Sequence, residues 1–465
     1  MDAFLAGLKT VIDSLGSTVV LPIFIFLLAW AMGAKPARAF RAGVTIGIAF
    51  IGINLVINLM WSSLSGVAQA MVTNTGIKLD TVDVGWPSAA AIAFGSSVGL
   101  WVIPIALLVN LVLLFTNVTK TLNVDIWNFW HFAFIGSLIV AATGQLWYGL
   151  VAAAIAAAFA LFLADWTAKA VQHFYGLPGI SIPHLTSAPV VPIAIGVNWL
   201  IEKIPGLRDW NADTETIQKK FGVLGEPIIQ GLVIGLILGI IGYYNAGDAA
   251  TVISKVLQCG MNLAAVMLLL PRMVKILMEG LIPVSEAART FMQKHYGGRE
   301  FYIGLDSAIL IGHPAAISSS LVLVPLVILL SFILPGNHVL LFADLAIIPF
   351  VVAMCAPLMK GNVVRIILAG LITLGVGFYF GTSMADLFTS AAMAAKFEMP
   401  ANAVKIISIG DGFLWPPFVF TNLVAALGVV GLVILLAAIA ALFFFFSKNT
   451  KSWEKAAGAP VEEKA

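Results

Sequence analysis

Residues 83–88 read Asp-Val-Gly-Trp-Pro-Ser and residues 304–307 read Gly-Leu-Asp-Ser, and each stretch opens a run rich in small residues. The first run is AAAIAFGSS and the second is AILIGHPAAISSS. Both lead into an apolar helix that carries a proline, Pro104 in the first and Pro325 in the second. Each whole stretch is longer than the about 20 residues that cross a bilayer and too interrupted to be one straight helix. The pattern therefore predicts two broken, re-entrant helices.

The same order of features continues after each proline. An acid on an apolar background follows about 20 residues later, Asp125 in NVDIWNFWH and Asp344 in FADLAIIPF. Segments broken by glycine and proline come next, GLPGISIPHLTSAP at residues 176–189 and IGDGFLWPP at residues 409–417. Five predicted spans precede the first of these segments, so the second copy starts from the opposite membrane face. The sequence predicts an inverted repeat whose matched interruptions form a transporter's binding site, and ordinary kinks are the alternative.

The composition indicates an all-α integral membrane protein. Of 465 residues, 60% are hydrophobic and 10% are charged, and the mean hydropathy of +1.02 excludes a water-soluble globule. Lys plus Arg (25) nearly balances Asp plus Glu (23), which argues against a nucleic-acid partner. Apolar runs predict about eleven spans: 17–32, 42–61, 98–115, 126–143, 146–163, 227–244, 251–270, 317–334, 339–359, 363–381 and 418–446.

The charges of the loops predict the orientation. Lys and Arg recur in every second short loop and after the last span, which marks those segments as cytoplasmic and places the N-terminus outside and the C-terminus inside. The first residues lack a basic region and a cleavage site, so we expect the first helix to be retained. The predicted parts are a first repeat at 1–200, a cytoplasmic linker at 201–222, a second, inverted repeat at 223–417, a final membrane helix at 418–446 and a cytoplasmic tail at 447–465.

Ionisable side chains at predicted membrane depth are the candidates for function, because they are costly in lipid unless they are paired or hydrated. Such residues lie at helix ends or in the broken segments: Asp83, Asp125, His131, His184, Glu226, Asp306, His313, Asp344 and Asp411. A neutral imidazole of His131 or His184 offers one donor and one acceptor to a hydroxyl. Helix capping is the alternative for Asp125, Asp344 and Glu226, and a structural role is the alternative for both histidines.

Aromatic residues accompany these candidates and have two interpretations. Trp86, Trp127, Trp130, Trp147 and Trp415 fit the aromatic belts at the membrane interfaces. Some of these rings could instead stack on the C–H face of a sugar whose hydroxyls bond to Asp, Asn, Gln or His. The choice stays open for Trp86 and Trp415.

The sequence lacks the motifs of several kinds of nucleotide, metal and haem sites. The sequence has no GxxxxGK[ST] loop for ATP, no HExxH or CxxC metal site and no haem attachment site, so no cofactor is expected. Cys259 and Cys355 lie in apolar runs without an acid–base partner and are expected to be inert. The glycine-rich run at residues 231–242 favours close helix packing over a phosphate cradle.

Six ordered motifs carry a family resemblance: VDVGWP at 82–87, NVDIWNFWH at 123–131, GISIPH at 179–184, KFGVLGEP at 220–227, IGLDSAILIGH at 303–313 and PGNHVLLFADLA at 335–346. In these motifs the chain resembles the galactitol-specific membrane component (IIC) of the bacterial phosphotransferase system. The resemblance weakens between residues 384 and 417. Members of this group could carry other polyols or pentoses.

The resemblance implies a dimer in the bacterial cytoplasmic membrane, with a static scaffold and a mobile core that moves as an elevator. In the related ascorbate-specific IIC proteins, histidines in H-x-x-F and G-x-S-I-x-H patterns contact the substrate, and here these are His131 with Phe134 and His184 with Gly179. The glutamines that follow in the ascorbate proteins are absent, which argues against ascorbate. The resemblance also implies that a cytosolic IIB protein, supplied by IIA, phosphorylates the polyol, so this chain needs no catalytic nucleophile. The expected substrate-binding residues are His131, His184, Asp83, Asp125, Asp306, His313, Asp344 and Trp86.

Two other functions compete with this expectation. An ion-coupled transporter of a small polyol, pentose or sugar acid would use Asp83, Asp306 or Asp344 to bind Na⁺ or H⁺. A membrane enzyme would need a nucleophile or metal constellation that the sequence does not show. The residues alone, without the resemblance, lead only to a transporter with an inverted repeat.

Overall fold

The computed structural model describes residues 17–75, 79–210, 212, 226–296, 299–341, 343–397, 399 and 403–460. The first residues, half of the predicted linker at 201–222 and the end of the predicted tail lie outside these ranges. We call residues 17–210 the N-terminal half and residues 226–460 the C-terminal half.

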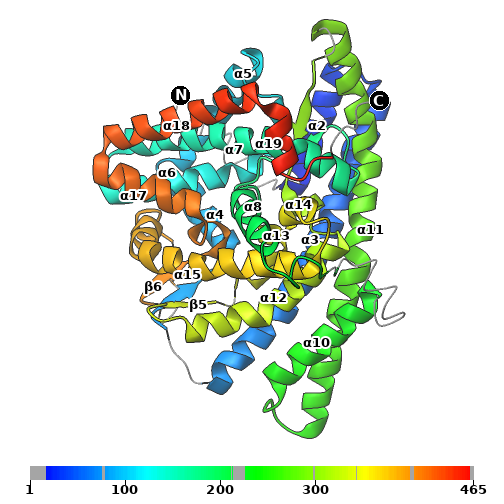
Figure 1. Cartoon of the computed structure of the whole chain (residues 1–465), viewed down its shortest axis with the longest axis vertical. Helices are drawn as coiled ribbons and strands as arrows, with labels where there is room; N and C mark the ends of the chain where they lie inside the picture. Colours follow the sequence, from blue (N-terminus) through cyan, green and yellow to red (C-terminus); the bar gives the residue numbers. More distant parts are fainter. Residues whose placement is uncertain are drawn as a thin grey trace.

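Four helices form one group on the right and at the bottom of Figure 1: α2 (Ser17–Ala31), α3 (Pro36–Thr75), α10 (Pro227–Tyr243) and α11 (Ala249–Tyr296). Glycines allow α10 to approach α11 closely. A Cβ atom on Gly231 would lie 2.7 Å from the Leu263 carbonyl oxygen, and one on Gly235 would lie 2.7 Å from the Cys259 carbonyl oxygen. A larger residue would force the helices apart, so the predicted close packing of residues 231–242 is confirmed.

The other helices form a second group, whose long members run across the view in Figure 1. Its N-terminal part is α4 (Trp86–Gly95), α5 (Gly99–Phe115), η1 (Ile126–Phe129), α6 (Trp130–Thr143), α7 (Leu146–Tyr175) and α8 (Val190–Ile201). Its C-terminal part is η3 (Ser307–Ile309), α12 (Pro314–Ile333), η4 (Leu345–Ile347), α13 (Ile348–Ala353), α14 (Cys355–Leu358), α15 (Val363–Ala394), α16 (Ile409–Gly412), α17 (Trp415–Leu427), α18 (Val429–Lys448) and α19 (Thr450–Ala456). Pro104 and Pro325 lie inside α5 and α12, as predicted.

Two small parallel sheets modify the expected all-α architecture. One has the order β5 (Val339–Leu340), β1 (Thr81–Asp83), β6 (Lys405–Ile407), and the other has the order β2 (Thr121–Asn123), β4 (Tyr302–Gly304), β3 (Ile180–Ser181). Val82 pairs with Leu340 and Ile406, and Ile303 pairs with Leu122 and Ile180. Each sheet therefore joins one strand of one half to two strands of the other. The pairing satisfies backbone groups of broken segments that apolar surroundings would leave without partners.

Within the described ranges, six helices are long and apolar enough to cross a membrane: Pro36–Leu64, Leu146–Tyr175, Ala249–Leu270, Pro314–Ile333, Val363–Ala394 and Val429–Lys448. The pair Ser88–Gly95 and Gly99–Phe115 bends by 88° and makes a seventh crossing if it counts as one span, which confirms the first predicted break. Four apolar helices are shorter: Trp130–Thr143, Val190–Ile201, Gly231–Tyr243 and Trp415–Leu427.

Three of the eleven predicted spans are not single helices. The stretch 126–143 divides into η1 and α6. The stretch 339–359 divides into β5, η4, α13 and α14, with Pro349 and Pro357 in the two short helices. The stretch 418–446 is divided between α17 and α18 at Gly428, which has a φ of 56°. Mean hydropathy did not reveal these breaks because the segments stay apolar through them.

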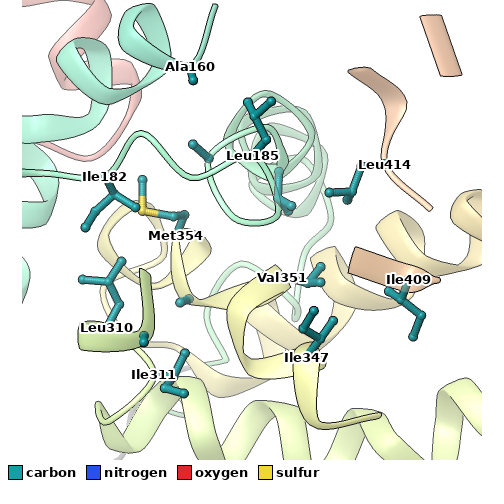
Figure 2. Close-up of a cluster of buried hydrophobic side chains, with 14 of the residues drawn as sticks. Ala160, Ile182, Leu185, Leu310, Ile311, Ile347, Val351, Met354, Ile409 and Leu414 are labelled. Carbon is teal, nitrogen blue, oxygen red and sulfur yellow. The ribbon is translucent and has the colours of Figure 1, made fainter. Parts of the chain in front are cut away.

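A buried apolar cluster holds the broken segments of the second group together, as Figure 2 shows. Its side chains come from the loop after β3, the turn around η3, the stretch η4–α13–α14 and the segment after β6: Ile182, Leu185, Leu310, Ile311, Ile347, Val351, Met354, Ile409 and Leu414. These segments are far apart in sequence, and their packing fixes the polar residues beside them.

Candidate functional site

The site lies where the loops after β3 and β6 meet the first turn of α6. His184 is three residues beyond β3, Asp411 lies in α16 just after β6, and His131 is the second residue of α6. All three side chains are buried. The Thr186 hydroxyl donates to the Gly410 carbonyl oxygen at 2.9 Å, which ties the two loops together.

Polar contacts connect these residues across both halves of the chain. Asp411 Oδ2 lies 2.8 Å from His131 Nδ1, and His131 Nε2 lies 3.4 Å from His184 Nε2. His184 Nε2 is also 3.6 Å from Asp306 Oδ1. The structure therefore brings together both predicted histidines and Asp306, and it pairs His131 with the carboxylate of Asp411.

Asn128 extends this contact chain to a further predicted acid. Its Nδ2 donates to Asp306 Oδ2 at 2.8 Å and to Asp125 Oδ2 at 2.6 Å. Asp125 precedes the 3-10 helix η1 without a side-chain capping bond, so the predicted capping alternative is not what the structure shows. Asp306 does cap η3, because its Oδ1 accepts from the Ala308 N–H at 2.8 Å. Asn128 was not among the candidates, although it lies within the quoted motif NVDIWNFWH.

Three buried polar atoms in this region have no hydrogen-bond partner among the described residues: Trp130 Nε1, His184 Nδ1 and Asp411 Oδ1. The Trp130 and His131 ring centroids are 4.1 Å apart, and the His131 and His184 centroids are 4.6 Å apart. A buried polar atom left unpaired costs about 1–3 kcal/mol. These atoms therefore mark a place where polar groups of a ligand would be stabilising. A fourth such atom, Thr421 Oγ1, lies on α17.

The site is rich in acids and poor in cations. Within the described part of the chain, no Lys or Arg forms an ion pair with Asp125, Asp306 or Asp411. No group of three or more His, Cys, Asp or Glu in that part could hold a metal ion. The side chains that face one another here are carboxylates, imidazoles, an amide and indole rings, which suit hydrogen bonding to neutral hydroxyls.

Two further predicted acids bind backbone groups. Asp344 Oδ1 accepts from the Trp86 N–H at 2.6 Å, and its Oδ2 accepts from Ser408 Oγ at 2.6 Å and from the Ile409 N–H at 2.8 Å. Asp83 Oδ1 accepts from the Gly85 N–H at 3.0 Å, and its Oδ2 accepts from the Asp344 N–H at 2.7 Å. These bonds join the segment after β1, the segment before η4 and the segment that carries Asp411.

The predicted aromatic residues fall into different environments. Trp86 contributes its backbone to the Asp344 bonds, and a Cβ atom added at Gly410 would lie 3.3 Å from both Trp86 Cβ and the Trp130 ring. Trp415 donates from Nε1 to the Pro189 carbonyl oxygen at 2.8 Å. Trp147 is exposed, as a belt residue would be, and the side chain of Trp127 lies outside the described part.

His313 lies apart from the histidine pair. It precedes α12, and its Nδ1 accepts from the Ala315 N–H at 3.2 Å, so it caps that helix. Its ring packs against Phe174 and Tyr175 of α7, with centroids 4.6 and 5.4 Å away. Glu226 precedes α10 in the other helix group without a side-chain capping bond.

One buried acid was missed from the sequence. Asp165 of α7 accepts from the hydroxyls of Thr119 and Thr121, at 2.8 and 2.7 Å, and from the Lys120 N–H at 3.0 Å. These bonds fasten β2 to α7. The available signal was an Asp that directly follows the long apolar run of residues 146–164 in α7.

A charged cluster lies beside the sheet β2–β4–β3. Glu300 forms ion pairs with Lys120 at 2.6 Å and with Lys169 at 2.5 Å. Burial would raise the pKa of Glu300, but the hydrogen bonds from the two lysines outweigh it and lower the pKa to about 2. The carboxylate is therefore ionised at neutral pH and bridges α7 to the start of β4.

Comparison with known proteins identifies relatives over most of the chain. Residues 10–402 match the EIIC-GAT family, described as the PTS system sugar-specific permease component, where PTS is the phosphotransferase system. The PTS system galactitol-specific EIIC components of Escherichia coli K12 and O157:H7 are each 43% identical over 402 residues, which is 86% of this chain and 88% of each relative. A putative permease IIC component of Escherichia coli K12 is 38% identical over 441 residues, which is 94% of this chain and 98% of that relative.

Proposed function

The chain belongs to the EIIC-GAT family of sugar-specific permease components of the phosphotransferase system, and we propose that its substrate is galactitol or a closely related polyol. The main support for a polyol substrate is the set of buried polar atoms without a hydrogen-bond partner at Trp130, His184 and Asp411. Polyol hydroxyls both donate and accept, so they can satisfy all three. The two relatives that are 43% identical are named as galactitol-specific, which supports this choice of polyol.

The role of this chain in the transport reaction follows from its family. A IIC component is the membrane part of the system and works with IIA and IIB proteins, which carry the phosphoryl group. Cys259 and Cys355 are buried, as expected for residues that do not carry a phosphoryl group. This chain would bind the polyol, orient it between the two halves and present a hydroxyl to the phosphorylated IIB protein.

We assign different roles to the predicted site residues. His131, His184, Asp306 and Asp125 belong to the contact chain and would bind or orient the polyol, whereas Asp344 and Asp83 position the backbone around it. The close approach of Trp86 and Trp130 to Gly410 favours apolar walls for the C–H face of the polyol. His313 supports the start of α12 rather than the substrate.

The sheet order supports an inverted repeat. If β1, β2 and β3 correspond to β4, β5 and β6, the order β5–β1–β6 of one sheet becomes β2–β4–β3, which is the order of the other sheet. A two-fold relation between the halves would produce this exchange. The second helix group would then be the mobile core of an elevator, and α2, α3, α10 and α11 would be the static scaffold that forms the homodimer.

Contacts at the two sheets support the proposed orientation, with the N-terminus outside and the C-terminus cytoplasmic. Lys120, Lys169 and Glu300, from segments expected to be cytoplasmic, meet at one sheet. The C-terminal helix α19 lies at the same end of α7, because Trp166 Nε1 donates to the Trp453 carbonyl oxygen at 2.6 Å. Asp80 and His338, from loops expected outside, meet at the other sheet.

Thermal unfolding of the purified protein in detergent tests the substrate. A ligand that binds the folded state raises the unfolding temperature as its concentration exceeds the Kd. We expect stabilisation by galactitol but not by sorbitol, mannitol, arabitol or ascorbate. If a different polyol raises the unfolding temperature instead, the proposed binding site stands but its substrate is that polyol. If no polyol raises the unfolding temperature, the proposed binding site is contradicted. Uptake that needs an ion gradient rather than phosphoenolpyruvate would contradict the transport mechanism.

A further inference from the structure

The two histidines lie between two carboxylates, and this arrangement sets the direction of their hydrogen bonds. Asp411 Oδ2 is 2.8 Å from His131 Nδ1. If Asp411 is ionised, its carboxylate can only accept, and His131 then carries its proton on Nδ1. Its Nε2 is then a lone pair that faces His184 Nε2 at 3.4 Å. At the other end Asp306 Oδ1 lies 3.6 Å from the same His184 nitrogen, which also favours a proton on His184 Nε2. Both carboxylates therefore favour the same pair of tautomers.

These tautomers determine what the site offers to a ligand. With its proton on Nε2, His184 presents a lone pair at Nδ1, which is buried and unpaired. Asp411 Oδ1 is a second unpaired acceptor, and the Trp130 Nε1–H is an unpaired donor. These three atoms together suit a ligand that donates hydrogen bonds to two positions and accepts one.

We propose that Asp411 determines the ligand specificity of this site, selecting neutral polyhydroxyl compounds and rejecting anions such as sugar acids and sugar phosphates. Asp411 acts directly through Oδ1, which accepts a hydrogen bond from a hydroxyl of the ligand. It acts indirectly through His131, whose tautomer favours a proton on His184 Nε2 and so leaves the lone pair of His184 Nδ1 free to accept from the ligand. No Lys or Arg of the described residues is paired with Asp411, Asp306 or Asp125, so a carboxylate or phosphate placed beside them would meet uncompensated negative charge. The inference rests on the proposed polyol site.

The contacts around Asp411 hold it in this position. The hydroxyl of Thr186 binds the Gly410 carbonyl oxygen, and the Gly410 N–H is 3.2 Å from Ser408 Oγ. A carboxamide at position 411 has nearly the same shape as the carboxylate but no charge. Asp411→Asn is therefore a test of charge and acceptor capacity rather than of packing.

The first experiment measures the tautomers in the protein without ligand. In ¹⁵N-histidine-labelled protein, protonated and lone-pair imidazole nitrogens give separate signals, which are assigned from the spectra of His131→Gln and His184→Gln. We expect His131 protonated on Nδ1, His184 protonated on Nε2, and a change of the His131 signals in Asp411→Asn. An unprotonated His131 Nδ1 would place the proton on Asp411 and overturn the inference, whether or not a polyol binds.

The second experiment measures the Kd of galactitol and of galactonate by calorimetry. Galactonate differs from galactitol in having a carboxylate in place of one terminal CH₂OH group. Wild type should bind galactitol and bind galactonate at least about 100-fold more weakly. In Asp411→Asn, the affinity for galactitol should fall by about 10- to 100-fold, since a hydrogen bond to a charged group is lost. The ratio of the galactonate Kd to the galactitol Kd should fall by at least about tenfold relative to wild type. Asp386→Asn is the control, because it removes the same charge from an exposed side chain paired with Lys405, and it should leave both values unchanged.

The outcomes separate this inference from the proposed function. Equal binding of both ligands by wild type, or an unchanged preference in folded Asp411→Asn, would overturn the role of Asp411 while polyol binding stands. If Asp411→Asn does not fold, Asp411→Glu keeps the charge and lengthens the side chain, and it should retain the rejection of galactonate. Binding of no polyol by wild type, with the expected tautomers present, would overturn the proposed substrate instead.

Discussion

Replacing Asp344 by Asn tests whether this acid is an anchor for the backbone rather than a substrate ligand. Its two oxygens accept from the Trp86 N–H, from the Ser408 hydroxyl and from the Ile409 N–H, all at 2.8 Å or less. These donors belong to two segments, one from each half, and the side chain is buried. An amide keeps one acceptor oxygen and turns the other position into a donor.

The expected loss of stability follows from these contacts. In the better orientation of the amide, its NH₂ group faces the Trp86 N–H, so at least one buried N–H loses its acceptor and the remaining bonds lose their charge. An unsatisfied buried donor costs about 1–3 kcal/mol, and charge-assisted bonds are roughly twice as strong as neutral ones. We therefore expect Asp344→Asn to lower the free energy of unfolding by about 2–4 kcal/mol.

Unfolding in detergent without ligand measures this loss, and galactitol binding measured below the unfolding temperature shows whether the site survives. Ser408→Ala is the matched control, because it removes one of the same donors and should cost only about 1 kcal/mol. If Asp344→Asn were as stable as wild type yet lost galactitol affinity, Asp344 would contact the ligand directly and the anchoring role would be wrong.

Three other predictions concern the site, the charged cluster and the orientation. His131→Ala and His184→Ala should each weaken galactitol binding by about 1–3 kcal/mol, because a ligand hydroxyl loses its partner, while expression persists; loss of folding in both would indicate structural roles. The pKa of Glu300 is lowered from 4.5 to about 2, so its ion pairs stabilise the folded state above about pH 4.5 and this contribution disappears as the pH falls toward 2. The difference in unfolding temperature between wild type and Glu300→Gln should therefore be constant near neutral pH and absent at about pH 2. It should be small throughout, because the ion pairs are half exposed. Cysteine labelling tests the orientation against a low background, since Cys259 and Cys355 are buried: an impermeant thiol reagent added outside intact cells should label Asn245→Cys but not Ser452→Cys, and the reverse result would invert the proposed topology.

Local signals in the sequence predicted the parts of the fold that depend on neighbouring residues. Glycine and proline at the ends of apolar runs predicted the break between α4 and α5 and the interruption before α12, because these residues do not continue a helix. The small-residue run at 231–242 predicted the close packing of α10 on α11. Both histidines were chosen because each is an ionisable group among apolar residues, and the structure brings them together.

The remaining features depend on contacts between distant residues. The strands have two or three residues each, too few to show a periodic pattern, and they pair across the two halves. The bond between His131 and Asp411 joins residues that are 280 positions apart. The sequence around either residue does not indicate that the other is its partner. Asp165 follows a long apolar run in α7, and its partners Thr119 and Thr121 cannot be recognised before the fold is known.

The site is formed between the halves, and this limits how it can work. His131 and His184 come from the N-terminal half, and each contacts an acid of the C-terminal half, Asp411 or Asp306. The sheets have the same construction, since each pairs one strand of one half with two strands of the other. Neither half can therefore form the contact chain alone, and separating the halves would break this chain together with the sheets. A transport movement that keeps the site intact must carry both parts of the second helix group as one body, which is the movement that an elevator requires.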